Sequence, residues 1–335
     1  MPAISPKVIV NQLLNAVHES GGTGAYVSES VRTHPRKFLI NYFGESYSVW
    51  VYIWTLTHGG RVSLPNEFRI QMTSVESPLE MNPDGITVLM GYHPDLEMFA
   101  GFDLRKHHTF TAGSPSVQID ISALNDALQN SLSFVTKDND EIAIGVRPDQ
   151  FLVYCINAEP LHIFGAEQEM TQILSRAASL EEIPEQTIED LAVDRKTVVE
   201  SVRKKSRDAN FKKIVMSAYN NRCAITRMQL RLVDAAHILP VAADSSSDHV
   251  TNGVALSPTF HRAYDNCLIY FDQDCFVRLS NEKVSELREA NLLGGLDTFS
   301  SFMDQKIHLP FDQSQRPRAE YIELANRHRR IPGYL

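Results

Sequence analysis

The sequence predicts an α+β protein of two domains, and three observations lead to this fold class. The chain has 335 residues, more than a single hydrophobic core usually organises. Its first half alternates aromatic and β-branched runs with turns rich in glycine and proline. Past residue 200 the pattern changes to a basic helical stretch followed by short apolar runs. We therefore expect a mixed α/β domain with an antiparallel-rich sheet over residues 1–165, a helical linker over 166–200, and a second domain, flanked by helices, over 201–335.

Composition narrows the class of protein. Lys and Arg number 32 against 41 Asp and Glu, so any binding to nucleic acid depends on where the charges lie rather than on the net charge of −9. No run of eighteen apolar residues is present, and the N-terminus lacks the pattern of a signal peptide. We therefore expect a cytoplasmic protein with no membrane partner. None of the four cysteines forms a C-x-x-C pair, which excludes a four-cysteine zinc knuckle and favours burial of the thiols.

The elements of the first domain follow from local patterns. Apolar residues at helical spacing predict a first helix over Pro6–His18, with Ser5 as its cap. A second helix is expected over Ser122–Gln129. Runs rich in aromatic and β-branched residues predict strands over Phe38–Phe43, Tyr47–Trp54, Glu67–Met72, Ile86–Met90, Met98–Phe102, Ile142–Val146 and Phe151–Cys155.

An acidic section and then a basic one follow the first domain. The acidic section, residues 181–190, is either a solvated helix face or an interdomain linker, and we favour the linker. The basic section is an amphipathic helix with Phe211 and Val215 on its buried side. Its cations are either a solvated face or contacts to DNA phosphates, and we favour phosphate contact. The predicted DNA-binding residues are Arg203, Lys204, Lys205, Arg207, Lys212, Lys213 and Arg222.

Residues 233–265 carry the side chains that a metal site and a general base require. The apolar run 233–239 predicts a strand that carries His237, and the run 251–256 predicts a partner strand that Asn252 opens. Ser257 and Pro258 are typical of a helix start, and this helix carries His261. A hairpin packed on a short helix would let the three polar side chains converge.

Residues 211–271 resemble the HNH endonucleases, the ββα-metal nucleases. The resemblance rests on the spacing of fifteen residues from His237 to Asn252 and nine more to His261, and on the flanking Arg222-Cys223 segment. It implies that His237 is the general base that takes a proton from the attacking water. An imidazole suits that role at neutral pH. It also implies that Asn252 holds the hairpin or the loop by hydrogen bonds, and that His261 binds the metal. We count these three residues as the catalytic set.

The resemblance implies one divalent metal. Mg²⁺ or Mn²⁺ is expected because a mixed nitrogen and oxygen site with open water positions suits these ions, and Zn²⁺ is the alternative. Many family members carry a ligand immediately before the base, where this chain has Ala236. Asp234, two residues earlier, is our substitute, and Asp265, one helical turn after His261, is the rival.

The first domain offers weaker signals. Seven strand aromatics form either a base-stacking cage or, as we favour, part of the core: Tyr42, Tyr47, Trp50, Tyr52, Trp54, Phe99 and Phe102. Asp95 followed by Asp103 and Lys106 resembles the carboxylate–lysine signature of another nuclease class, with the lysine one position late. We favour a surface turn there.

These observations predict a metal-dependent DNA endonuclease of restriction or phage defence, which hydrolyses phosphodiester bonds while the first domain selects the target. In one alternative the first domain senses a small ligand or a protein partner and licenses nonspecific cleavage. In a second alternative the chain is a DNA-binding protein with a decayed site, because Ala236 replaces a ligand. The expected partners are double-stranded DNA and a second copy of the chain. A cognate methyltransferase system is also expected, because the first domain resembles modules found beside restriction and methylase genes.

Overall fold

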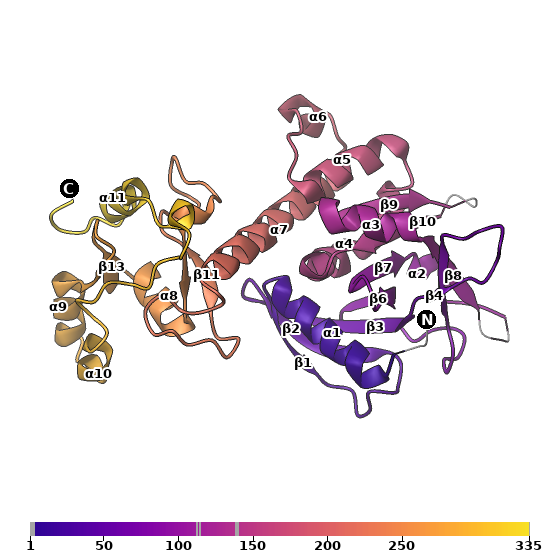
Figure 1. The fold of residues 1–335 in the computed structure, drawn as a ribbon, viewed down its shortest axis with the longest axis horizontal. Coiled ribbons are helices and arrows are strands. Elements are labelled where there is room, and N and C mark those ends of the chain that lie inside the picture. The colour runs from indigo at the N-terminus through magenta and orange to yellow at the C-terminus, as the bar shows by residue number, and fades with distance from the viewer. Residues whose placement is uncertain (1–3, 112, 114, 138–140, 335) are drawn as a thin grey trace. The chain divides into compact units, whose positions relative to one another are not determined.

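The computed structural model describes residues 4–111, 113, 115–137 and 141–334. The chain divides into two compact units, Met1–Ala209 and Asn210–Leu335 (Figure 1). Each unit combines helices with small or large sheets, so the predicted α+β class is confirmed. No helix within the described ranges is long and apolar enough to cross a membrane.

The first unit is built on a large mixed sheet. Its strand order is β1-β2-β3-β6-β7-β10-β9; β3 and β6 pair in parallel, and the other neighbours formed by described residues are antiparallel, as predicted. These strands are β1 (Thr23–Tyr26), β2 (Arg36–Tyr42), β3 (Glu45–Thr55), β6 (Ile86–His93), β7 (Met98–Phe102), β9 (Leu132–Thr136) and β10 (Ile142–Val146). A second sheet of order β4-β5-β8 contains β4 (Thr57–His58), β5 (Glu67–Gln71) and β8 (Ser116–Asp120).

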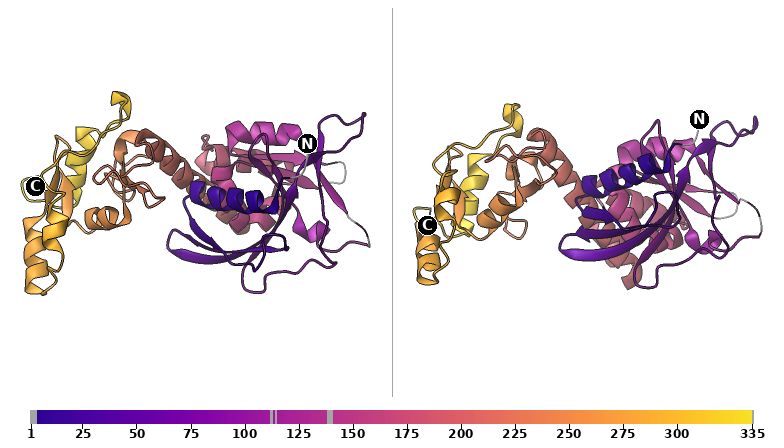
Figure 2. Two further views of the ribbon diagram at one scale, coloured as in Figure 1. Left: turned by 60° about the horizontal axis from the view of Figure 1, so that its bottom comes forward. Right: turned by 90° about the horizontal axis from the view of Figure 1, so that it is seen from below.

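Both faces of the large sheet are buried over its central strands β3, β6, β7 and β10, because alternate side chains of these strands enter different cores. On β2 every second side chain is buried and the opposite face is more exposed. On β3, Val49, Val51 and Ile53 join a core with α1 (Pro6–Glu19) and α4 (Phe151–Phe164). Tyr52 and Trp54 face the opposite core, which α3 (Ile121–Asn130) and the second sheet complete. Figure 2 shows α1 lying along the sheet. Five of the seven strand aromatics proposed for a cage, Tyr42, Tyr52, Trp54, Phe99 and Phe102, are buried in these cores, as we favoured.

One predicted strand of the first unit was wrong. Residues 151–155 form the first turns of α4 rather than a strand. Residues 151–155 are all buried, so the start of this helix lacks the polar face that marks a surface helix. The first helix, by contrast, begins after Ser5, whose hydroxyl accepts a hydrogen bond from the Val8 amide as the cap prediction requires.

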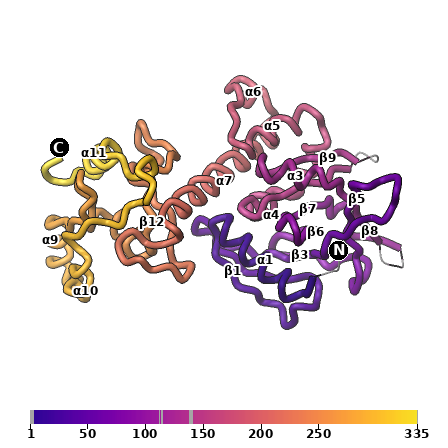
Figure 3. Tube along the Cα trace, in the orientation of Figure 1, coloured from indigo at the N-terminus to yellow at the C-terminus, as the bar shows by residue number. Residues whose placement is uncertain are grey.

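The segment expected to be a linker is helical but packs into the first unit. It comprises α5 (Gln168–Ser179), α6 (Glu185–Glu189) and the beginning of α7 (Val193–Ala218), whose course Figure 3 traces. Met170, Leu174 and Val199 lie in the same core as α1 and α4. Its structural role is therefore to extend that core, since these side chains are buried there. The short elements α2 (Leu104–His107) and η1 (Pro148–Gln150) complete the unit.

The second unit surrounds the predicted hairpin and helix. The hairpin strands β11 (Asp234–His237) and β12 (Gly253–Leu256) are antiparallel, and α8 (Pro258–Asp265) follows directly, as predicted. A second hairpin and further helices cover the unit: β13 (Ile269–Phe271), β14 (Val277–Leu279), α9 (Asn281–Glu289), α10 (Leu296–Ser300), α11 (Ala319–His328), η2 (Val250–Asn252) and η3 (Gln313–Gln315). Three cysteines are buried, whereas Cys267 is half-buried.

Candidate active site

The end of α7 packs closely on the β11–β12 hairpin at Gly253. Gly253 pairs with His237 across the hairpin. A Cβ atom at Gly253 would lie 2.3 Å from Cγ2 of Val215 and 3.2 Å from Cζ of Phe211. Only a residue without a side chain fits this approach, since the contacts of a real Cβ are longer. The glycine at the start of β12 therefore allows α7 to pack closely on the hairpin.

His237 is held between an aromatic ring and a carboxylate. Its imidazole stacks on Phe211 with ring centroids 3.6 Å apart and an interplanar angle of 9°. Its Nε2 lies 2.9 Å from Oδ1 of Asp248 in the loop after β11. A carboxylate accepts hydrogen bonds, so Nε2 carries the proton in this contact, and Nδ1 is the basic nitrogen of the neutral ring. Both contacts fix the orientation of the ring.

Asn252 is fully buried and clamps the loop that joins the hairpin strands. Its Oδ1 accepts a hydrogen bond from the Leu239 amide at 2.8 Å. Its Nδ2 donates to the Leu239 carbonyl at 3.1 Å and to the Ser247 carbonyl at 2.9 Å. Because Ser247 precedes Asp248, this clamp also positions the carboxylate that meets His237.

The carbonyl group that follows His237 is fixed from the C-terminal segment. Arg329 donates from Nη1 to the Ile238 carbonyl at 2.7 Å, and the Tyr264 hydroxyl donates to the same oxygen at 2.9 Å. The Arg329 guanidinium also lies over the Tyr264 ring, 4.1 Å from its centroid. The role of Arg329 within this unit is therefore to hold the end of β11.

Three of the sequence-predicted residues line one pocket of about 410 Å³: Asp234, His261 and Asp265. Nε2 of His261 lies 3.5 Å from Oδ2 of Asp265, as expected for residues one helical turn apart. The exposed Arg262 lies on the same rim. His237 does not line this pocket, so the structure gathers the metal candidates on one side of the hairpin and holds the base candidate by Phe211 and Asp248.

Asp234 already has a cationic neighbour. Nζ of Lys212 lies 3.5 Å from its Oδ1, and only 15% of the lysine side chain is exposed against 48% of the aspartate. Burial lowers the pKa of the Lys212 ammonium, and the nearby Asp234 carboxylate offsets part of this effect. Lys212 therefore differs from the solvent-facing phosphate contact that its place in the basic run predicted.

The candidate ligands do not form a complete cage. Among residues of the described ranges, no three His, Cys, Asp or Glu side chains gather closely enough to hold a metal ion. Ala236 is buried in the core of the second unit, and its methyl side chain has no atom that could bind a metal.

The other predicted DNA contacts divide by exposure. Arg203, Lys204 and Lys213 are exposed, whereas Arg207 is half-buried. Lys205 lies over the Tyr42 ring, with its Nζ 5.3 Å from the centroid. Arg222 donates to the carbonyl of Arg227 at 3.4 Å, so it contacts the turn after α7.

Comparison with known proteins agrees with this geometry. Residues 223–272 match a family model described as HNH endonuclease, which spans β11, β12 and α8. This chain carries an HNH endonuclease domain. The recognition made from His237, Asn252 and His261 is thereby confirmed for the domain. The HNH endonuclease family implies phosphodiester hydrolase activity and a divalent metal.

Further matches lie outside the HNH domain or span both units. Residues 47–155 match a family model described as Methylase-associated X1. No curated protein matches the chain. Among solved structures, the chain is similar to one titled "Modification dependent TagI restriction endonuclease", with 11% identity, a TM-score of 0.28, and coverage of 84% of this chain and 82% of that chain.

The sequence did not predict the contact of Asp248 with His237, the stacking of Phe211 on His237, or the ion pair of Lys212 with Asp234. Asp248 lies in a polar loop without periodicity, and its contact with His237 depends on the clamp made by Asn252. The stacking of Phe211 on His237 and the Lys212–Asp234 pair are likewise tertiary contacts between α7 and β11. A polar loop that begins and ends at motif residues was the one signal that a further site residue lay within it.

Proposed function

We propose that this chain is a metal-dependent DNA endonuclease of restriction type. In this proposal the HNH domain hydrolyses the phosphodiester bond and the first unit selects the target. The observation that carries the proposal is the fixed His237 ring, stacked on Phe211 and hydrogen-bonded to Asp248 beside the β11–β12 hairpin. An imidazole held in this way is oriented for proton transfer. A histidine that only filled space in a core would not need a fixed ring orientation.

The residues around the hairpin divide the chemistry between them. His237 would accept the proton of the attacking water, and the carboxylate of Asp248 would stabilise the imidazolium that results. Asn252 would keep the His237 and Asp248 side chains in contact, because it holds the loop that carries Asp248. Arg262, exposed on the rim of the neighbouring pocket, would bind a phosphate oxygen of the backbone.

The pocket of Asp234, His261 and Asp265 fits a divalent metal in the chemistry of its donors. Mg²⁺ is usually bound through one or two carboxylates and keeps several waters, so an incomplete protein cage suits it, and Mn²⁺ accepts a mixed nitrogen and oxygen site. His261 with Asp234 or Asp265 would hold the ion. Bound there, a divalent ion supplies positive charge that stabilises the phosphorane and the leaving oxygen.

The assignment of target selection to the first unit rests on the Methylase-associated X1 match at residues 47–155. A domain of that family beside a nuclease domain supports a restriction context, in which DNA modification distinguishes host from foreign DNA. Double-stranded DNA is the proposed substrate, and two copies of the chain would be needed for one HNH site to cut each strand.

Plasmid cleavage tests the proposal. Purified full-length chain is incubated with supercoiled plasmid and Mg²⁺, Mn²⁺ or Zn²⁺, beside His237→Ala and the control His328→Ala, which removes an exposed histidine on α11. We expect cleavage by the wild type and by the control, and a loss of roughly 10²–10⁴-fold in the His237 variant. Equal cleavage by all three proteins would remove His237 from the mechanism. DNA binding without cleavage under every metal would favour the non-catalytic alternative.

A further inference from the structure

The first unit contains a small cavity where the carboxyl end of β7 meets α2 and α4. Its volume is about 250 Å³. Apolar and aromatic side chains form much of its wall: Met81, Val88, Phe102, Leu104 and Tyr154. Pockets for drug-sized ligands measure roughly 300–1,000 Å³ and share this apolar lining with a few placed polar groups. The cavity therefore suits a ligand smaller than a typical drug.

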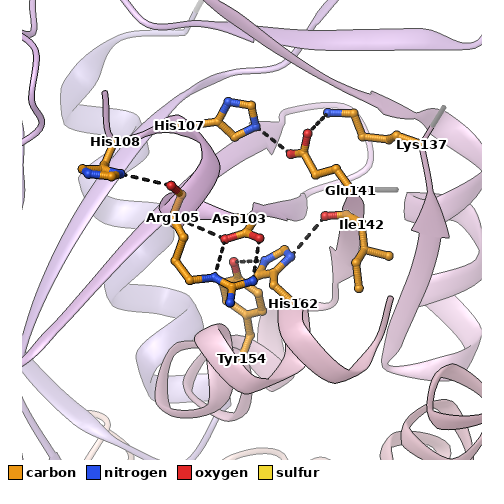
Figure 4. A network of polar contacts seen from close by, with 9 residues as sticks. All are labelled: Asp103, Arg105, His107, His108, Lys137, Glu141, Ile142, Tyr154 and His162. Atoms are coloured by element: carbon orange, nitrogen blue, oxygen red, sulfur yellow. Dashed lines mark hydrogen bonds and ion pairs between the residues drawn. The ribbon is translucent and has the colours of Figure 1, made fainter. Parts of the chain in front are cut away.

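A buried carboxylate and a guanidinium stand side by side in the cavity wall (Figure 4). Asp103 is only 3% exposed, contrary to the surface turn that its sequence context suggested. Its Oδ1 accepts from Nε of Arg105 at 2.9 Å, and its Oδ2 accepts from Nη2 at 2.7 Å. Oδ1 also accepts from the Arg105 amide, which caps α2. This bidentate pair is rigid, and Arg105 keeps 43% of its side chain exposed.

Burial raises the pKa of the Asp103 carboxyl, but the hydrogen bonds from Arg105 and the nearby His162 and Arg105 charges outweigh it, so its net pKa lies below the usual range. Asp103 is therefore an ionised acceptor. Its two oxygens offer about four acceptor sites, and Arg105 occupies three. A ligand with an N–H group could fill the remaining site while it accepts a hydrogen bond from the guanidinium edge.

A second set of hydrogen bonds fixes the ring of Tyr154, which forms the aromatic floor of the cavity. His162 lies within 3.1 Å of the Ile142 carbonyl through Nδ1, and its Nε2 lies 3.0 Å from the Tyr154 hydroxyl. A carbonyl only accepts, so Nδ1 carries the proton, and the Tyr154 hydroxyl donates to Nε2. A Cβ on Gly101 would lie 2.2 Å from Cζ of Tyr154, so the tyrosine ring packs directly against the β7 backbone. The floor is thus set before any ligand arrives.

We propose that this cavity binds a single nucleobase extruded from the DNA duplex. The inference rests on the proposed function, because target selection by the first unit is what would bring DNA to it. A nucleobase is flat and heteroaromatic, and its polar edge places donors beside acceptors. These features match the apolar and aromatic part of the cavity wall together with the Asp103–Arg105 pair. A base stacked within a duplex cannot enter a walled cavity, so it must leave the stack.

The test uses the full-length chain with His237→Ala, without divalent metal, so that DNA stays intact. The probe is a short duplex carrying a mismatched 2-aminopurine, a nucleobase that fluoresces more brightly when it leaves the stack. Arg105→Ala removes the guanidinium, and Met81→Trp narrows the half-exposed rim without touching the polar network. Arg61→Ala is the matched control, because the exposed Arg61 side chain pairs with Glu67 outside the cavity.

We expect bright fluorescence on binding, and about tenfold weaker binding or a lost signal in both cavity variants but not in the control. An unchanged signal in both variants would overturn the proposal. Plasmid cleavage by the wild type is measured separately. Cleavage with no fluorescence response overturns the cavity proposal alone, whereas a response that needs Arg105 in a chain that never cleaves DNA supports the cavity and overturns the nuclease assignment.

Discussion

Asp248 holds the imidazole of His237 from a loop that Asn252 clamps to the hairpin. The 2.9 Å contact joins Oδ1 of Asp248 to Nε2 of His237, and the Ser247 carbonyl accepts a hydrogen bond from Asn252 immediately before it. The asparagine of the HNH pattern therefore acts on His237 indirectly, through the loop, and the aspartate makes the contact with the ring.

Replacing Asp248 should slow cleavage without weakening DNA binding. In Asp248→Asn the amide can present its NH₂ group to Nε2, and the stabilisation of a charged imidazolium is lost. We expect kcat for plasmid cleavage to fall about tenfold or more, with KM nearly unchanged, because the contact matters most when His237 has taken up the proton. Asp244→Asn, an exposed carboxylate in the same loop, is the control. A rise in KM alone, or an equal loss in the control, would contradict a role of Asp248 in the proton transfer.

The close approach of α7 to the hairpin predicts an effect of Gly253→Ala on stability. The new methyl group would meet Val215 at 2.3 Å within a fully buried core. Overpacking of this kind costs roughly 1–3 kcal/mol, and the shift of Phe211 should also disturb the stacked His237. Thermal unfolding and plasmid cleavage should both decline. Gly294→Ala is the control, because nothing lies within 4 Å of its Cβ position, and a similar loss there would argue against the packing explanation.

The sequence predicted elements whose pattern is local. Ser5 and Pro6 mark the start of α1, where the Ser5 hydroxyl caps the helix. Ser257 and Pro258 mark the start of α8, although the Ser257 side chain makes no capping hydrogen bond there. The prediction failed at residues 151–155, because every side chain of this helix start is buried and no polar face marks it. The hairpin of β11 and β12 and the helix α8 were predicted because their motif residues also lie close together in the sequence.

The side chains that complete the site could not be read from the sequence. Asp248 reaches His237 only after the loop is folded back by Asn252, and Lys212 reaches Asp234 only after α7 packs on β11. Asp103 illustrates the same limit in the first unit. A turn-like sequence context predicted exposure, and tertiary packing buried the carboxylate beside Tyr154.

The buried His162 predicts a pH dependence of stability. Burial lowers the pKa of its imidazole from 6.5 to about 4, while the carboxylates of Asp103 and Glu141 raise it and Arg105 lowers it further. Between pH 6.5 and about 4 the unfolded chain binds the extra proton, so stability should fall as the pH drops through this window. His162→Gln should flatten the slope in urea unfolding.

Glu141 provides a check on that window. Burial raises its pKa, but hydrogen bonds from His107 and Lys137 outweigh this and lower it to about 2. The Glu141 carboxylate therefore contributes its full stabilisation above pH 4.5, the pKa of this group in the unfolded chain. This stabilisation is lost as the pH falls toward 2. The two residues thus act mainly in different ranges of pH. A slope between pH 6.5 and 4.5 that persists unchanged in His162→Gln would show that other groups cause it.

The Lys212–Asp234 pair gives a way to identify the second protein ligand of the metal. If Asp234 binds the ion, the Lys212 ammonium 3.5 Å from its carboxylate opposes binding. Lys212→Gln should then tighten Mn²⁺ binding roughly fivefold, corresponding to ~1 kcal/mol for a unit charge beside a half-exposed carboxylate. Isothermal calorimetry on the metal-free chain measures this change. The double variant Lys212→Gln/Asp234→Asn should lose the gain, because the two residues act on one site. If Lys212→Gln leaves the affinity unchanged while Asp265→Asn weakens it, the ligand is Asp265, one helical turn from His261.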